Sequence, residues 1–410
     1  MKLLAPALLV LLGTVLAVRA AEEGLFHSDP NHAWNRLHSH LHTRTTREGK
    51  RYNQEGLEPL FFRRSRFLTN GAAHKQALAL LDRFLENHEE RLIDDPLKRA
   101  ILQRDLWAIF NMTADAELDR QPERRQLQKR LALVMRRIAL SPDEIKKLPD
   151  NLALAVQAKT FPQTYDPSDP DRPFLPSDLL KADGPWVMLG DRWGWKGDFL
   201  AAPVHAKALG GRSVVLIFLR LPGGGEKAEA YLKTLESVRI GTDEIPQIPA
   251  GTQVALLRRM LLFDKNGTIR PTPITESLQI RVYQDLKAPD SFEFTLGRKE
   301  LFESRMGLDA VGPEEINYFD VGLVRESARD PFENSTPGRG PSPVVLKSCI
   351  TCHAGPGIWG FRSMFVEQYD HPAMCVPDDL NDQLEEAIEE AQKTYAWGLL
   401  QGLWEAAESP

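Results

Sequence analysis

The sequence has only three cysteines among 410 residues, and it has no long apolar run after its first twenty residues. So few cysteines exclude a disulfide-stapled scaffold, which would contain more of them and in even number. Because no apolar run of ~20 residues follows, the sequence predicts no transmembrane helix after residue 20. Basic residues are not in excess either, since 51 Lys and Arg stand against 57 Asp and Glu. This mild acidity argues against nucleic acid and anionic membrane surfaces as partners.

The N-terminus has the pattern of a secretory signal. Lys2 precedes an apolar run that ends at Val18, and Ala20 follows with small-residue spacing typical of a cleavage site. We predict that residues 1–20 are a signal peptide and that the mature chain is periplasmic or secreted, with no integral membrane segment. Its removal takes away two cations and no acid, so the formal net charge moves from −6 to −8. An uncleaved N-terminal anchor is the alternative.

Two of the cysteines, Cys349 and Cys352, belong to the sequence Cys-Ile-Thr-Cys-His, which ends at His353. The two-residue gap places both thiols on one side of a helical turn, where each can form a thioether bond to a haem vinyl group. The imidazole that follows at once is placed to act as the proximal ligand of the haem iron. This spacing is the signature of c-type haem attachment. We therefore predict one covalent haem c, held by the two cysteines, with His353 on the iron.

Residues 347–360 resemble the haem-attachment segment of c-type cytochromes. The resemblance implies a covalently bound haem c and, as is usual in that family, electron transfer with a redox partner protein. It covers this short stretch only, and the remainder resembles uncharacterised bacterial secreted proteins that carry one such motif. The chain departs from the small-cytochrome pattern, because only 57 residues follow His353. We expect upstream residues to cover part of the haem, which would then be embedded in the larger protein.

The distal side of the iron decides what such a haem does. Met374 is our candidate for the sixth ligand, and His371, Met364, an upstream residue or an open position are the alternatives. A methionine ligand favours electron transfer at raised potential, whereas an open position favours a haem-dependent peroxidase-like oxidoreductase. Arg362 is a candidate partner for a haem propionate, because a guanidinium matches a carboxylate.

A reading without haem also fits the cysteines. Cys349 and Cys352 could form a disulfide after export, or they could bind zinc together with His371 and Cys375, which lie 18 and 22 residues past His353. Either arrangement would make the chain a non-redox binding protein.

The fold class predicted from the patterning is α+β. A polar segment, 21–56, contains His27, His32, His38, His40 and His42, which we interpret as scattered surface histidines, with a metal site or a distal haem ligand as alternatives. The remaining boundaries are a helical domain over 57–160, a proline-rich linker or extended wrap over 161–184, a β-rich domain over 185–330, and 331–410 for the haem segment and one long amphipathic helix.

Local signals place several elements within these ranges. Asp95 before Pro96 predicts a helix start, and Ser141 with Glu144 forms a capping-box pattern. The stretch 264–267 predicts a hairpin turn, and the three glycines 223–225 predict a turn rather than a phosphate cradle. We expect the C-terminal helix to pack on the haem segment or on the β-rich part.

Overall fold

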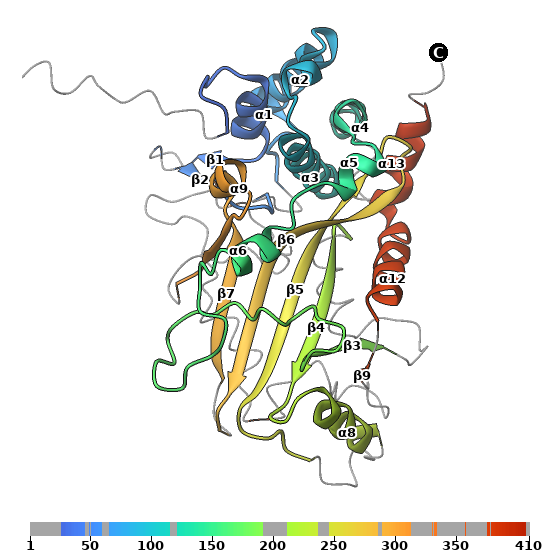
Figure 1. Cartoon of the computed structure of the whole chain (residues 1–410). Coiled ribbons are helices and arrows are strands. Elements are labelled where there is room, and N and C mark those ends of the chain that lie inside the picture. The colour runs from blue at the N-terminus through green and yellow to red at the C-terminus, as the bar shows by residue number, and fades with distance from the viewer. Residues whose placement is uncertain are drawn as a thin grey trace, which may run out of the picture.

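The computed structural model describes the parts of the chain that build one helical layer and one sheet. The described residues are 26–45, 49, 51–59, 65–114, 121–191, 211–236, 246–285, 289–312, 330, 332–333, 357, 375–377 and 379–406. Helices lie mainly across one face and one end of a long antiparallel sheet (Figure 1). The α+β class predicted from the patterning is therefore correct.

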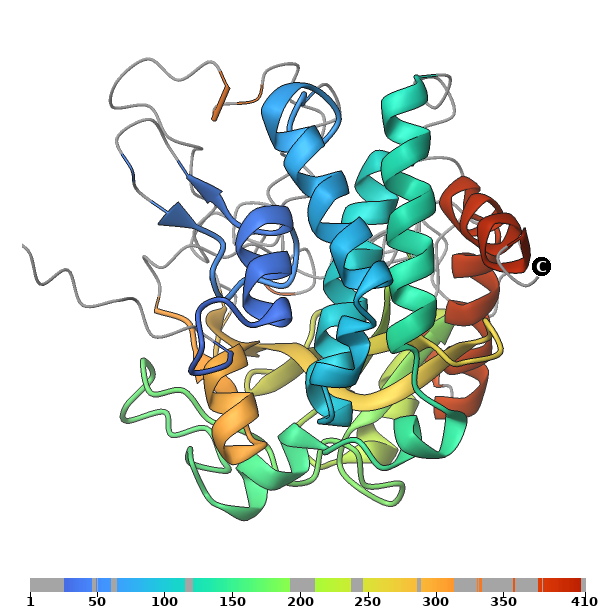
Figure 2. The ribbon, with the colours of Figure 1, turned by 90° about the horizontal axis from the view of Figure 1, so that it is seen from above.

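The helices of the N-terminal half form the layer that covers the sheet. They are α1 (Ala33–Leu41), α2 (Gly71–Glu86), the 3-10 turn η1 (Glu89–Leu92), α3 (Pro96–Thr113), α4 (Pro122–Ile138), α5 (Pro142–Lys146) and α6 (Asn151–Gln157). Seen from above, α3 runs beneath α2 and α4, close to the strands (Figure 2). The predicted helix starts are confirmed: the Asp95 carboxylate accepts a hydrogen bond from the Leu97 amide, and Ser141 with Glu144 forms the reciprocal capping box.

Among the described residues, the main sheet has seven strands, all antiparallel, in the order β8-β7-β6-β5-β4-β3-β9. Their bounds are β3 (Val187–Asp191), β4 (Ser213–Arg220), β5 (Thr252–Phe263), β6 (Ile269–Tyr283), β7 (Asp290–Leu296), β8 (Leu308–Ala310) and β9 (Cys375–Pro377). Strands β5 and β6 form the predicted hairpin, whose turn includes Gly267 at a φ of +75°. A separate two-stranded ribbon pairs β1 (Arg44–Thr45) with β2 (Arg51–Tyr52).

The two faces of the sheet bury different partners, because successive side chains of a strand point to opposite sides. On one face Val214, Leu216 and Phe218 of β4 join the large core beneath the helices. On the other face Val215, Ile217 and Leu219 join a smaller cluster with helix α8 (Gly225–Glu236). The predicted glycine turn precedes α8, and both Gly223 and Gly224 have positive φ there.

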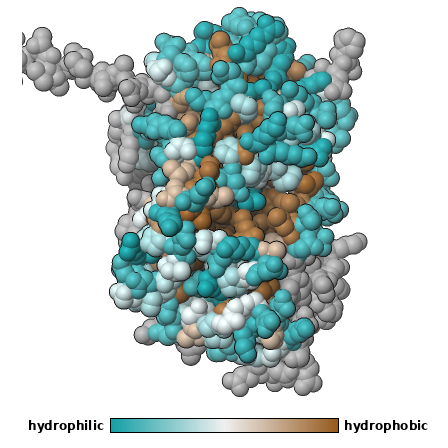
Figure 3. Space-filling model, viewed as in Figure 1, coloured by the Kyte–Doolittle hydropathy of each residue, from teal (hydrophilic) through white to brown (hydrophobic). Residues whose placement is uncertain are grey.

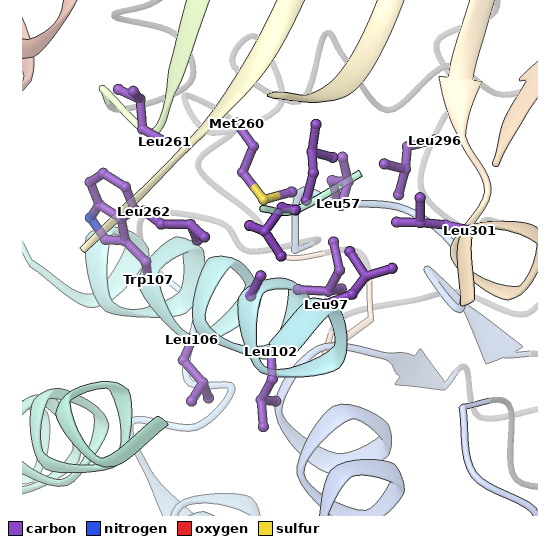
Figure 4. Close-up of a cluster of buried hydrophobic side chains, with 14 of the residues drawn as sticks. Leu57, Leu97, Leu102, Leu106, Trp107, Met260, Leu261, Leu262, Leu296 and Leu301 are labelled. Carbon is purple, nitrogen blue, oxygen red and sulfur yellow. The ribbon is translucent and has the colours of Figure 1, made fainter. Parts of the chain in front are cut away.

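Helix α3 lies at the centre of the large core and is buried on all sides. Leu97 and Trp107 approach side chains of the sheet, such as Met260 and Leu262, while Leu102 and Leu106 point toward the other helices (Figure 4). A helix buried all round has no solvent-facing side, so every polar residue on it needs a partner inside the protein.

The proline-rich segment lies on the helical face of the sheet as an extended wrap. Phe161 makes an edge contact with Phe294, and Tyr165 and Phe174 contact Phe292. The Tyr165 hydroxyl donates a hydrogen bond to Asp290 over 2.5 Å. These contacts hold the segment against β7. In the middle of this face apolar side chains gather, whereas the helical end is mainly hydrophilic (Figure 3).

The C-terminal part is not one long helix, as the sequence pattern predicted, but two: α12 (Leu380–Gln392) and α13 (Tyr395–Ala406). The break falls at Thr394, whose hydroxyl accepts a hydrogen bond from the Trp397 amide and so caps the second helix. Helix α12 packs on β4 and β6, and α13 packs on α4. The expectation that this region packs on the β-rich part is correct.

A short helix, α9 (Arg298–Ser304), follows β7 and contributes Leu301 to the core. Buried apolar residues from Phe26 to Trp404 form one continuous cluster. None of the described helices is long and apolar enough to cross a membrane.

Candidate functional site

The residues predicted to bind the haem lie outside the described part of the chain. This applies to Cys349, Cys352, His353, Arg362 and Met374, and also to the alternative ligands Met364 and His371. Their roles stay predictions. The structure does describe one anchoring point on each side of the motif. The downstream one includes the backbone of Cys375, the first residue of β9.

The downstream anchor is strand β9, at the edge of the sheet. Its backbone pairs with β3 in the register Asp191↔Cys375 and Leu189↔Pro377. Strand β8 forms the opposite edge. The stretch of chain that carries the motif thus connects the two edges of one sheet, and from β9 onward the chain contributes α12 and α13 to the common core.

The upstream anchor is a contact that we call the Arg44–Asp330 clasp, formed by Arg44, Ser65, Phe67, Asp330 and Phe332. The Arg44 guanidinium donates to the Asp330 carboxylate over 2.9 Å and lies 4.0 Å from the ring centre of Phe67 and 4.4 Å from that of Phe332. The Ser65 hydroxyl donates to the same carboxylate over 2.5 Å. Burial lowers the pKa of Arg44, and Asp330 offsets part of that shift. The clasp ties residues ahead of the motif to the N-terminal ribbon.

Two of the N-terminal histidines are not on the surface, as the sequence interpretation expected. His38 and His42 are 3% and 1% exposed, because they lie one turn apart on the side of α1 that faces the core. Their rings stack at 5.1 Å between centres. The His42 ring Nε2 lies 2.8 Å from the Gly56 carbonyl. The surface interpretation is therefore wrong for this pair, whereas His27, His32 and His40 remain partly exposed.

A buried ion pair joins this histidine pair to the centre of the fold. Arg298, at the start of α9, donates two hydrogen bonds to Asp105 of α3, over 2.5 and 2.7 Å. Arg298 also lies 3.2 Å from the His42 Nε2, and the Asp105 carboxylate lies 3.9 Å from the His42 Nδ1. Burial, opposed by Asp105, lowers the pKa of His42 to about 4, and burial likewise lowers the pKa of His38 well below its usual value.

A second buried network centres on Arg104, the residue next to Asp105. Arg104 donates to Glu276 of β6 over 2.7 Å and to Glu58 over 2.5 Å. Arg212 also pairs with Glu58, and Arg258 with Glu276 at 3.1 Å. Burial lowers the pKa of Arg104, but the two carboxylates outweigh it and the net shift is upward. The network ties α3 to the sheet.

The chemistry of these two networks is structural. Each carboxylate named above is paired with an arginine, and the groups are buried, so no base or nucleophile is presented to a substrate. Within the described ranges no three histidine, cysteine, aspartate or glutamate side chains are grouped so that they could hold a metal ion. For the described histidines, including His38 and His42, the metal-site alternative therefore has no support.

The sequence interpretation missed both networks, although one signal was present. In the stretch 100–110 of α3, Gln103, Arg104 and Asp105 are the polar residues in a segment that is otherwise apolar on every side. Polar residues in such a helix predict buried partners. The identity of those partners could not be deduced, since Glu276 lies 172 positions away in the chain.

Comparisons with known proteins add no further information on function. No protein family, no curated protein and no solved structure matches the chain.

Proposed function

We propose that this chain is an exported c-type haem protein that transfers electrons through one covalently attached haem. The observation that carries the proposal is the Cys349-Ile-Thr-Cys352-His353 sequence, because its donor set fits this cofactor: two thiols at the required spacing, followed at once by an imidazole. In this proposal the thiols hold the porphyrin and His353 binds the iron. The haem, when bound, supplies one-electron chemistry.

The described anchors support a haem that is embedded in the protein. The clasp at Asp330 and strand β9 at Cys375 tie the chain to the fold on both sides of the motif. Helices α12 and α13 then place Ala391, Leu400 and Trp404 in the large core. In this proposal the motif belongs to the same folded unit as its two anchors, and the embedded haem stays a prediction. Met374 remains our candidate for the sixth ligand and Arg362 for a propionate partner.

The proposal is tested by expressing the full chain in a host that has haem c maturation machinery. The purified protein is expected to carry one haem that denaturation and acid extraction do not remove, with the corresponding increase in mass. Replacing both Cys349 and Cys352 with alanine is expected to abolish covalent haem, whereas the matched control Cys375→Ala is expected to retain it. A colourless product with both thiols oxidised or bound to zinc would overturn the proposal.

The same material separates electron transfer from peroxidase-like activity. A protein ligand on each side of the iron is expected to prevent rapid carbon monoxide binding in the reduced state. Met374→Ala is then expected to lower the reduction potential and to open the iron to carbon monoxide, whereas Met364→Ala is the control. Rapid binding of carbon monoxide by the unaltered protein would instead indicate an open distal site and favour the oxidoreductase.

A further inference from the structure

Helix α1 packs on the core through two buried imidazoles, those of His38 and His42, whose protonation would be unfavourable. The Nε2 of His38 and the Nδ1 of His42 are both buried, and neither nitrogen has a hydrogen-bond partner in the described structure. The stacked rings are enclosed by aromatic side chains, with Phe26 and Trp34 at 4.9 and 5.2 Å from the His38 ring. A protonated imidazole here would be a buried cation with an unsatisfied N–H group, which is costly.

The charged groups that face the pair come from α9, β2, α3 and the loop that contains Glu58, and they do not offset that cost. Arg298 of α9 lies against His42, and Arg51 of β2 acts on His38 in the same repulsive sense. Asp105 and Glu58 attract a charge on His42. Both carboxylates are already paired, Asp105 with Arg298 and Glu58 with Arg104. A protonated His42 would therefore lie beside the Arg298 cation and beside a carboxylate, Asp105, that is already paired with that arginine.

The same helix leads directly into the clasp. His42 is separated from Arg44 by a single residue, Thr43, whose hydroxyl donates back to the Ser39 carbonyl over 2.6 Å. Arg44 begins β1 and reaches Asp330 through a guanidinium held between two aromatic rings. Displacement of the end of α1 would move the backbone that carries Arg44, and so would withdraw the guanidinium from Asp330.

We propose that the buried His38–His42 pair is an acid-sensitive latch, which holds helix α1 in place when neutral and releases α1 together with the Arg44–Asp330 clasp when protonated. The proposal goes beyond the haem function and does not depend on it, since every group in it is described in the polypeptide itself. It assigns to the N-terminal segment a regulatory role at the point where residues ahead of the motif are tied down.

The direction of the effect follows from proton linkage. A histidine whose pKa is depressed in the docked state binds its proton only after release, so docking is strongest above the ordinary pKa of 6.5 and weakens as the pH falls toward 4. For His42 alone, lowering the pH from 7 to 4.5 is expected to raise the population of the released state about 60-fold. His38 adds to the change in the same direction.

The test is hydrogen exchange of the full chain, measured by mass spectrometry at several pH values and corrected for the intrinsic exchange rate. Peptides from α1 and from residues 330–333 are expected to lose protection together between pH 7 and pH 4.5. Helix α4, which packs on α2, α3 and α13, is expected to keep its protection and serves as the internal reference. Loss of protection in α4 at the same pH as in α1 would indicate global unfolding and would overturn the latch.

Variants of single histidines test the cause. His38→Phe keeps an aromatic ring among Phe26 and Trp34 but removes the titrating nitrogens, so it is expected to shift release to lower pH. His42→Gln is expected to do the same, while His40→Gln, on the partly exposed side of α1, is the matched control. Release of α1 and of 330–333 at an unchanged pH in both test variants would overturn the proposal. If a variant does not fold, hydrogen exchange of the unaltered chain still tests the proposal. Loss of protection in α1 at a pH at which residues 330–333 stay protected would overturn it.

Discussion

Arg104 offers the sharpest test of how the helical layer is held on the sheet. Its guanidinium is fully buried and donates to two carboxylates that come from different parts of the chain, Glu58 and Glu276. We consider the replacement Arg104→Met, which fills a similar volume and removes the charge. Both carboxylates then lose a donor in a place that water does not reach.

Two independent estimates give the size of the effect. Removing one partner of a buried ion pair typically costs about 3–5 kcal/mol in the free energy of unfolding. Two charge-assisted hydrogen bonds at about 1.5–3 kcal/mol each give about 3–6 kcal/mol. Glu58 keeps Arg212, and Glu276 keeps Arg258 and a hydrogen bond from Ser213, so the lower end applies. We expect Arg104→Met to lower the free energy of unfolding by about 3 kcal/mol.

Urea unfolding followed by circular dichroism measures this loss. The matched control is Arg130→Met on helix α4, which removes a half-exposed ion pair with Asp82 and is expected to cost less than ~1 kcal/mol. Arg104→Lys is expected to fall between the two, because an ammonium retains the charge but lacks the planar fork that reaches both carboxylates. A loss for Arg104→Met no larger than that of the control would refute the view that this network ties α3 to the sheet.

Other substitutions test local features of the fold by thermal or urea unfolding. Gly307→Ala is expected to destabilise by several kcal/mol, because the residue has a φ of +56° and a Cβ would lie 2.5 Å from the Cβ of Leu301. Gly398→Ala on α13, where a Cβ would meet nothing within 4 Å, is expected to stabilise by about 0.5–1 kcal/mol; effects of equal sign at the two glycines would contradict this reasoning. Tyr165→Phe is expected to cost about 1 kcal/mol by removing the hydrogen bond to Asp290, and no loss would show that the aromatic contacts alone hold the wrap.

Features that depend on neighbouring residues could be predicted from the sequence. The caps at Asp95 and Ser141 and the hairpin turn at 264–267 are each specified within a few positions, and all are present. The buried strand β4 is equally local, since its apolar run is uninterrupted. Such signals fix where elements begin and end, and from their order the α+β class follows.

Features that depend on distant residues could not be predicted. The stacking of His38 on His42 is compatible with helical spacing, but their burial results from contacts with α3 and α9, which no local pattern specifies. The break between α12 and α13 is similar, because the apolar stripe continues across Thr394 and only the hydroxyl cap reveals the interruption. The periodicity of apolar residues does not show which polar side chains have partners far away in the sequence.

The haem-binding residues present the opposite case. The prediction for Cys349, Cys352 and His353 depends on chemistry at adjacent positions, so the sequence alone carries it. Met374 and Arg362 depend on the fold around the iron. Their distance from His353 in the sequence makes them candidates but does not single them out. Which residue occupies the distal side is a question of tertiary placement, and the spectroscopic experiments above address it directly.

The two buried networks and the clasp together show how the N-terminal part is tied to the segments around the motif. Apolar packing alone is non-directional and would allow a helix to shift over the sheet. A guanidinium that donates to a carboxylate requires a specific geometry, and so it fixes the position of the helix. Arg104 and Arg298 fix α3 against β6 and α9, and Arg44 fixes the ribbon against Asp330. The chain passes from α1 through His42, which lies against Arg298, to Arg44 of β1, so in the proposed latch a change at the histidine pair reaches Asp330 through adjacent residues. The position of residues ahead of the motif is therefore linked to the protonation of a site that is close to the other end of the chain.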